Sequence, residues 1–203
     1  MPDFDTKQLL QLVPPSIHDR LWIAGGYLAD PERACDIDAW LLDAANNGEE
    51  FSLAHNYALK AWWNLEPLEI ARRIAPYVGH DAPSEYVDSL KAKGIYYVGS
   101  LQLSTWPKPV QLFATPYTTI TELLADFDVS THQVAQHVAT GMLATIQTTT
   151  ATNAIPRITN WATPATTLVR IERLAKRYGF SLDALPDYAR LRGLTENQEG
   201  LAA

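Results

Sequence analysis

Short apolar runs bounded by turn residues recur along the chain and predict the strands of a sheet. Leu21–Ala24 is one such run, which stops at a pair of glycines, and residues 37–42 form another. Apolar runs of this length between turn signals are typical of buried strands. Residues 95–103 and Val110–Ala114 are β-rich, and the segment that joins them contains two prolines. We therefore expect a hairpin with a rigid loop in this region.

Helical periodicity is strongest in the C-terminal third of the chain. Apolar positions recur there at helical spacing up to a glycine stop at Gly179, namely at Leu168, Ile171, Leu174, Ala175 and Tyr178. This pattern predicts an amphipathic helix. Thr119 and Glu122 have the spacing of a capping box, which predicts a helix over residues 120–127. Two further helices are expected, over residues 5–13, ended by Pro14-Pro15, and over most of residues 53–78.

Combined, these elements predict an α+β chain in which helices pack on a mixed sheet. Residues 134–138 fit either a strand or a helix, and the threonine-rich stretch 145–152 fits neither pattern clearly. No internal repeat or low-complexity linker separates two domains, and 203 residues suffice for one good core. We expect a core over residues 1–150, a C-terminal helical segment packed on it over 151–193, and a mobile tail over 194–203, which looks frayed from Glu196 onwards.

The composition narrows the class of protein. Hydrophobic residues make up 47% of the chain and charged residues 19%, the balance of a soluble globular protein. No apolar run approaches the roughly 18 residues of a membrane helix, so we expect no membrane contact. The N-terminus lacks the basic region of a secretory signal, and the one cysteine, Cys35, excludes an internal disulfide, so we expect a cytoplasmic protein. The net charge of -7 argues against coating nucleic acid through bulk charge, although it leaves room for a local basic site.

The strongest chemical signal is a glycine pair, Gly25-Gly26, followed by Asp36 and Asp38. Residues two apart in a strand point to the same face, so these two carboxylates should project together while Ile37 enters the core. Adjacent carboxylates repel each other, and a cation between them relieves the repulsion. Mg²⁺, or Mn²⁺, suits oxygen ligands and is usually held by one or two carboxylates and by substrate phosphates.

The glycine pair adds a second half to this site. Without a Cβ, the backbone N–H groups of Gly25 and Gly26 can approach a phosphate closely. A metal pair beside a phosphate-binding turn predicts in-line phosphoryl or nucleotidyl transfer. The alternatives are an ordinary strand-to-helix turn at the glycines and an exposed strand end at Asp36 and Asp38.

At these residues the sequence resembles the DNA polymerase β-like nucleotidyltransferase superfamily, in which a glycine pair precedes a short helix and an Asp-x-Asp strand. The resemblance is strongest to the head domain of CCA-adding enzymes and bacterial poly(A) polymerases, and to small viral relatives of them. It implies a nucleotidyltransferase-type sheet in the core, Asp36 and Asp38 as catalytic metal ligands, and a nucleotide-binding turn at Gly25 and Gly26.

Three later segments resemble motifs of this family in the correct order. Residues 110–113 stand at the strand of its third carboxylate, and residues 168–175 resemble one of its helices. The segment Phe127-Asp128-Val129-Ser130-Thr131-His132 resembles an Arg-Asp-Phe-Thr-Ile-Asn segment that contacts the nucleotide. The resemblance therefore implies further nucleotide contacts from Asp128, His132, Arg170 and Arg173.

Some of these residues also have simpler explanations. Arg170, Arg173 and Arg177 form one basic helical face, which is either a solvated surface or a local contact for a triphosphate or nucleic acid. Asp128 is either a turn residue or a functional one.

The sequence also departs from the family. Gln111 stands at the third carboxylate, Phe127 replaces the arginine of the nucleotide segment, and Ala29 replaces the arginine that usually follows the glycine pair. An amide is neutral and a poorer metal ligand than a carboxylate. These differences argue against ordinary CCA addition and are also compatible with a relative that has lost catalysis.

We therefore expect a metal-dependent nucleotidyltransferase that moves a nucleoside monophosphate from a nucleoside triphosphate (NTP) to an RNA, a protein or a small molecule. The alternative is an inactive pseudo-nucleotidyltransferase that acts as a binding or inhibitory protein. The pair Asp36 and Asp38 favours the enzyme, whereas Gln111 favours the inactive relative.

Overall fold

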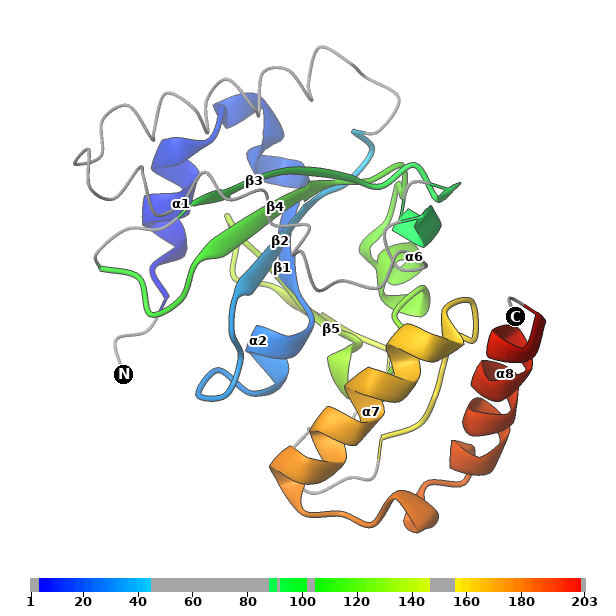
Figure 1. Cartoon of the computed structure of the whole chain (residues 1–203). Coiled ribbons are helices and arrows are strands. Elements are labelled where there is room, and N and C mark those ends of the chain that lie inside the picture. Colours follow the sequence, from blue (N-terminus) through cyan, green and yellow to red (C-terminus); the bar gives the residue numbers. More distant parts are fainter. Residues whose placement is uncertain (1–3, 45–87, 91, 102–104, 147–155, 202–203) are drawn as a thin grey trace, which may run out of the picture.

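One mixed sheet organises the part of the chain that the structure, a computed structural model, describes: residues 4–44, 88–90, 92–101, 105–146 and 156–201. Its six strands follow the order β3-β4-β2-β1-β5-β6 (Figure 1). The pairing of β2 with β4 is parallel, and the other pairings are antiparallel. The strands are β1 (Leu21–Ala24), β2 (Ile37–Leu41), β3 (Tyr96–Leu101), β4 (Val110–Ala114), β5 (Val134–His137) and β6 (Leu143–Thr145).

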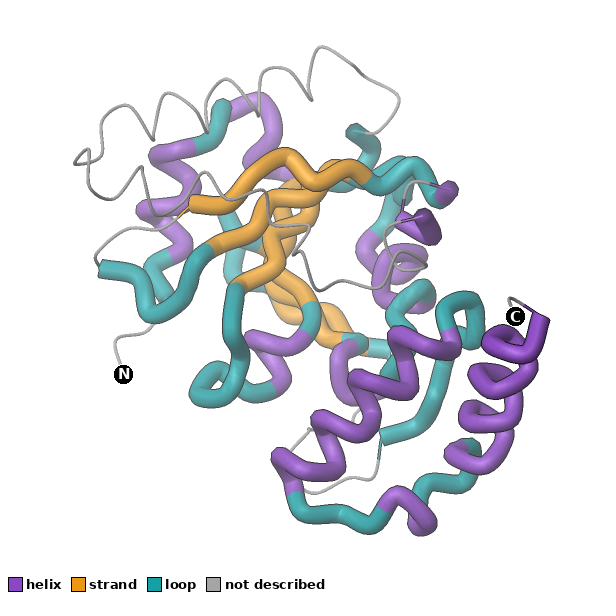
Figure 2. Tube along the Cα trace, in the orientation of Figure 1, coloured by secondary structure: helices purple, strands orange, loops and turns teal. Residues whose placement is uncertain are grey.

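Helices lie on both sides of this sheet and at its lower edge in the view of Figure 2. The α-helices are α1 (Thr6–Leu12), α2 (Gly26–Ala29), α6 (Ile120–Ala125), α7 (Pro164–Tyr178) and α8 (Tyr188–Leu201). Among the described residues there are also three 3-10 turns: η1 (Pro15–Arg20), η2 (Ser130–His132) and η3 (Leu182–Ala184). The mixed sheet with its flanking helices confirms the predicted α+β class.

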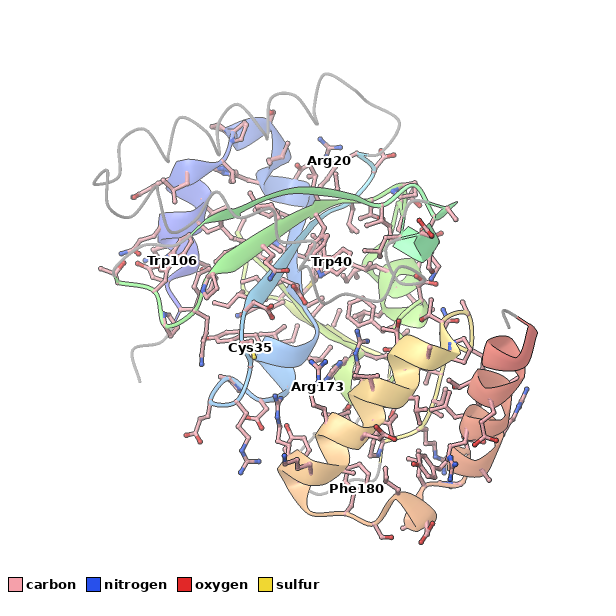
Figure 3. All side chains as sticks on the ribbon, viewed as in Figure 1. Arg20, Cys35, Trp40, Trp106, Arg173 and Phe180 are labelled. Atoms are coloured by element: carbon pink, nitrogen blue, oxygen red, sulfur yellow. The ribbon has the colours of Figure 1, made fainter. Side chains whose placement is uncertain are left out.

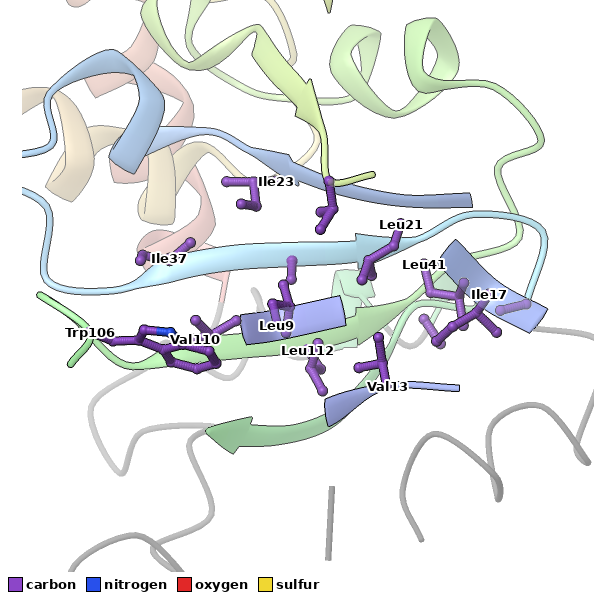
Figure 4. Packing of buried hydrophobic residues seen from close by; sticks show 14 residues of the cluster. Leu9, Val13, Ile17, Leu21, Ile23, Ile37, Leu41, Trp106, Val110 and Leu112 are labelled. Atoms are coloured by element: carbon purple, nitrogen blue, oxygen red, sulfur yellow. The ribbon is translucent and has the colours of Figure 1, made fainter. Parts of the chain in front are cut away.

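Side-chain alternation along the central strands creates two different faces. Ile37, Ala39 and Leu41 of β2 are buried in the cluster that α1 covers. Figure 4 shows this cluster, in which Leu9 of α1 lies against β4. Trp40, which points the other way, belongs to a second buried cluster that includes residues of α6. Because Asp38 shares the parity of Trp40, it stands on this second face.

Local sequence signals explain where the helices begin and end. Asp5 caps α1, and its side chain accepts a hydrogen bond from the backbone N–H of Lys7 at 2.9 Å. Thr119 and Glu122 form the predicted capping box of α6. Pro164 opens α7, and Gly179 ends it in a left-handed conformation with φ of 70°.

The predicted elements at these positions are confirmed, including the hairpin of β3 and β4. Residues 134–137, which fit two patterns in the sequence, form a strand because they pair with β1. The predicted helix over residues 53–78 lies outside the described residues. No helix in the described part of the chain is long and apolar enough to cross a membrane.

At the C-terminus, the structure differs from the sequence pattern in the extent of the last helix. Helix α8 continues to Leu201, so the predicted tail boundary at residue 194 lies inside a helix. Leu191 explains the difference, because it is fully buried in a cluster with Ile171 and Leu174 of α7. Tertiary packing on α7 stabilises a helix that its own sequence signals only weakly. Tail mobility and the domain boundaries at residues 150 and 193 remain predictions.

Candidate active site

The glycine turn between β1 and α2 is sterically demanding. Gly25 has φ of +94°, a conformation that L side chains rarely adopt. A Cβ at this position would lie 3.3 Å from Cε2 of Phe127 and 3.7 Å from Oδ2 of Asp38. The Gly25 N–H donates a hydrogen bond to the carbonyl oxygen of Val134 at 3.0 Å. The turn is therefore anchored on β5, and its backbone approaches the Asp38 carboxylate closely.

Asp36 and Asp38 meet at the beginning of β2. Asp36 immediately precedes the strand, and Asp38 is its second residue and is partly exposed. Gln111, the register partner of Asp38 on β4, donates from Nε2 to Oδ2 of Asp36 at 2.8 Å. Ile37 between them is fully buried, as expected for a residue that points to the opposite face. Gln111 thus lies beside Asp38 in the sheet and contacts Asp36 through its side chain.

The electrostatics of this pair are unfavourable for two charged carboxylates. Burial, and next the negative charge of Asp36, raise the pKa of the Asp38 carboxyl to about 8, while Arg170 opposes the shift. Gln111 is buried, with 3% of its surface exposed, and offers Asp36 a neutral donor rather than a positive charge. A divalent cation at Asp36 and Asp38 would remove this repulsion, so the donor set fits Mg²⁺ or Mn²⁺.

A third acidic ligand is absent from the described part of the site. Among the residues that the structure describes, no group of three or more His, Cys, Asp and Glu side chains gathers in a metal-binding arrangement. The Gln111 amide, substrate phosphates and water are further oxygen donors that such a cation could use.

Asp128, which precedes η2, connects this region to helix α7. The Asp128 side chain is buried and accepts a hydrogen bond from Oγ1 of Thr167 at 3.0 Å. Its other oxygen forms an ion pair with the Arg170 guanidinium. The charge of Arg170 also acts on Asp38, so this arginine lies near the acidic pair as well as against Asp128. The structure therefore brings Arg170 and Asp128 to the site, and it shows Asp128 as a partner of α7.

His132 lies beside the second glycine of the turn. Its Nε2 is 3.9 Å from the position that a Cβ would occupy at Gly26. Burial, and next the charge of Arg170, lower the pKa of the His132 imidazole to about 4, while Asp128 opposes the shift. The ring is therefore neutral at pH 7 and can donate one hydrogen bond and accept another.

The remaining arginines continue the basic face along α7. Arg177 lowers the pKa of His132 through its charge, so its guanidinium acts on the same region as Arg170. Arg173 is exposed, and Figure 3 shows it on the side of α7 nearer to α2. The triphosphate contact of this face remains a prediction. Arg170 differs from a simply solvated residue because it forms an ion pair with the buried Asp128.

An aromatic stack beside the glycine turn was not predicted from the sequence. Trp40 stacks on Phe113 with ring centroids 4.6 Å apart, and Phe127 lies against Trp40 at 5.7 Å. The strand parity of Asp38 and Trp40 could have placed the indole on the same face as the carboxylate. The contact of Phe127 with Gly25 depends on residues about a hundred positions apart, and no local signal announces it.

The two glycines are expected to respond differently to substitution. Gly25→Ala places a side chain at positive φ and against Phe127, and it should lower the melting temperature by roughly 4–8 °C, about 2 kcal/mol. Gly26→Ala has no neighbour closer than 3.9 Å and lacks the positive φ, so the melting temperature should change by less than about 2 °C. Thermal unfolding of both variants measures the difference, and equal losses would contradict the description of the turn.

Comparison with known proteins identifies the fold. No family model and no curated protein matches the chain. Two solved structures described as a tRNA-processing enzyme, in apo forms I and 2, both align with a TM-score of 0.52. They are 13% and 16% identical to the chain, covering 95% and 89% of it and 46% and 47% of their own chains.

A CCA-adding enzyme of Thermotoga maritima complexed with tRNA aligns with a TM-score of 0.47 at 16% identity, covering 88% of this chain and 42% of that one. The chain thus spans less than half the length of these structures. At 13% and 16% identity, the likeness to the two structures with a TM-score of 0.52 shows the fold alone, which is of the nucleotidyltransferase type.

Proposed function

We propose that the chain is a metal-dependent nucleotidyltransferase, which moves a nucleoside monophosphate from an NTP to an acceptor. The observation that carries this proposal is the meeting of Asp36, Asp38 and the Gly25 turn on one face of a nucleotidyltransferase-type sheet. The acceptor is an RNA end, a protein side chain or a small molecule. An RNA end is the first to test, because the solved structures with this fold are described as tRNA-processing enzymes.

The reaction follows from the chemistry of the NTP. An acceptor hydroxyl oxygen forms a bond to the α-phosphorus, and its proton passes to solvent. The bond between that phosphorus and the bridging oxygen of the β-phosphate breaks, and pyrophosphate leaves with the electron pair. A divalent cation at Asp36 and Asp38 would polarise the phosphoryl oxygens and balance the charge on the leaving group.

Residues of the chain itself hold the triphosphate in place. Arg170 supplies positive charge near the acidic pair, and Arg173 adds to the basic face of α7. The Cβ-free backbone of Gly26 leaves room for a phosphate beside His132. The neutral His132 can hydrogen-bond the nucleotide without adding charge. Asp128 orients Arg170 through their ion pair, and Thr167 in turn orients Asp128.

The charged Asp38 carboxylate is expected to destabilise the metal-free protein. Because the pKa of Asp38 is raised in the folded state, the folded protein binds one more proton than the unfolded chain between the ordinary value of 3.8 and about 8. Stability therefore falls as pH rises through that window, and the full penalty is present above pH 8. Asp38→Asn removes the penalty, on the order of 2 kcal/mol because Asp38 keeps partial exposure, and should raise the melting temperature in EDTA at pH 8 by roughly 4–8 °C.

A divalent metal ion should remove this destabilisation of the parent protein. Mg²⁺ or Mn²⁺ should raise the melting temperature of the parent protein, and more so with an NTP present, because a ligand of the folded state stabilises it. The variant Asp36→Asn with Asp38→Asn should show no metal-dependent shift. An unchanged shift in this double variant would place the metal elsewhere.

A second candidate function rests on Gln111. The hydrogen bond from this neutral amide to Asp36 satisfies the acidic pair in part without a metal, as expected in a relative that has lost catalysis and binds a partner instead. Such a protein would show no transfer with any NTP, and restoring a carboxylate at position 111 alone would not create it.

A further inference from the structure

A second link between α7 and the glycine turn lies beyond the site residues described above. The Tyr178 hydroxyl donates a hydrogen bond to Oδ2 of Asp30 at 2.6 Å. The same oxygen is 3.7 Å from Nη1 of Arg33, whose guanidinium carbon lies 5.3 Å from the centroid of the Tyr178 ring. The Asp30 side chain is only 11% exposed, so this hydrogen bond is largely shielded from water.

Each partner of this hydrogen bond is fixed to a helix at the site, Asp30 to α2 and Tyr178 to α7. The backbone N–H of Asp30 donates to the carbonyl oxygen of Gly26 at 2.9 Å, so Asp30 closes the short helix that begins at the glycine turn. Tyr178 is the last residue of α7, and the left-handed Gly179 that follows ends the helix there. Movement of α7 relative to the glycine turn would therefore have to break or stretch this hydrogen bond.

Two polar links hold α7 on the side away from its apolar cluster, and one of them reaches the helix that begins at the glycine turn. The apolar face of α7, including Ile171 and Leu174, packs in a cluster with Leu185 and Leu191 from the C-terminal segment. On its other side, the Arg170–Asp128 ion pair holds the middle of the helix, and Tyr178 holds its end. These two points are about 12 Å apart along the helix axis, with Arg173 and Arg177 between them.

We propose that Tyr178 is a positioning residue, which through Asp30 sets the separation between the arginines of α7 and the Asp36–Asp38 pair and thereby the affinity for a metal-bound triphosphate. This inference rests on the proposed function and adds to it a residue pair that touches neither metal nor nucleotide. Holding charged groups at a fixed separation lowers the reorganisation that accompanies ligand binding.

The chemistry of the pair suits a permanent link. Burial, the hydrogen bond to Asp30 and the charge of Asp30 all raise the pKa of the Tyr178 hydroxyl, so it remains a protonated donor throughout the neutral range. The acceptor is a carboxylate, and hydrogen bonds to charged groups are stronger than those between neutral ones. Arg33 balances the charge of Asp30 from the exposed side.

The test measures the binding of Mg²⁺-tripolyphosphate, and of each ribonucleoside triphosphate with Mg²⁺, by calorimetry. Tyr178→Phe and Asp30→Ala should each weaken binding roughly three- to tenfold, as expected for the loss of one charge-assisted hydrogen bond. Asp30→Asn keeps a carbonyl oxygen as acceptor and should stay within about twofold of the parent. The double variant Tyr178→Phe with Asp30→Ala should bind as weakly as either single variant, because both remove the same interaction.

Tyr188→Phe is the matched control. Its hydroxyl donates to Oε1 of the exposed Glu172 at 3.4 Å, on the side of α7 that faces α8. This variant should bind tripolyphosphate like the parent. In the transfer assay, Tyr178→Phe should raise KM for the NTP with little change in kcat, whereas a merely structural role would lower the melting temperature and leave affinity intact well below it.

The outcomes separate this inference from the proposed function. Parent-like tripolyphosphate affinity in folded Tyr178→Phe, or in Asp30→Ala if the first variant does not fold, overturns the positioning role alone. Independent, additive losses in the double variant overturn it as well. A parent protein that binds neither tripolyphosphate nor any NTP overturns the proposed function, and the positioning role with it.

Discussion

Replacing both Asp36 and Asp38 by asparagine is expected to reduce nucleotidyl transfer by at least about a thousandfold. The substitution keeps the shape of each side chain and removes the two negative charges that would hold the cation. Loss of a group that stabilises charge in the transition state typically costs two to three orders of magnitude, and here two such groups are lost together. Transfer of the labelled α-phosphate under single-turnover conditions measures the loss.

Asp19→Asn is the control for this experiment. Asp19 is 81% exposed and outside the site, so its substitution should leave transfer unchanged. The double variant should also keep the fold, since the metal-free protein gains stability when this repulsion is removed. Strong transfer that survives Asp36→Ala would exclude the acidic pair as the metal site.

Gln111→Glu is expected to destabilise the metal-free protein but to strengthen its response to metal. Without metal, the substitution removes the donor to Asp36 and adds a third anion at a position that is 3% exposed, so unfolding should become easier by about 2–4 kcal/mol. With Mg²⁺, the added carboxylate becomes a ligand, and both the metal-dependent rise in melting temperature and the transfer rate should exceed those of the parent protein.

Gln133→Glu separates metal ligation from ordinary burial of charge. Gln133 is equally buried and also donates through Nε2, to the carbonyl oxygen of Leu124 at 3.0 Å. Its glutamate variant should lose stability without recovering it in Mg²⁺. If Asp128 has replaced the third carboxylate, Gln111→Glu should instead do little and Asp128→Asn should abolish transfer. If the parent protein and both variants all show no transfer, the result would support a relative that has lost catalysis.

Much of the fold follows from local patterns in the sequence. The apolar runs of β1 and β2, the capping box at Thr119 and the glycine stop at Gly179 each depend on residues close in the chain. The common face of Asp36 and Asp38 follows from strand geometry, because the buried Ile37 between them fixes the alternation.

Long-range contacts set the parts that the sequence could not predict. Residues 134–137 form a strand by pairing with β1, and α8 extends past residue 194, the tail boundary predicted from local signals. Asp30 and Tyr178 are 148 positions apart, and nothing in their neighbourhoods indicates that they meet. The role of Asp128 as the partner of Arg170 likewise depends on the packing of α7.

The most direct measurement follows the two ends of the triphosphate separately. The protein is incubated with Mg²⁺, cell extract and each NTP, labelled either at the α- or at the γ-phosphate. The α-label should appear on an RNA, protein or small-molecule acceptor, the γ-label should be released in pyrophosphate, and EDTA or the Asp36→Asn, Asp38→Asn variant should prevent both. Transfer of the γ-label to the acceptor, or no transfer of the α-label from any of the NTPs, would contradict the assignment of a nucleotidyltransferase.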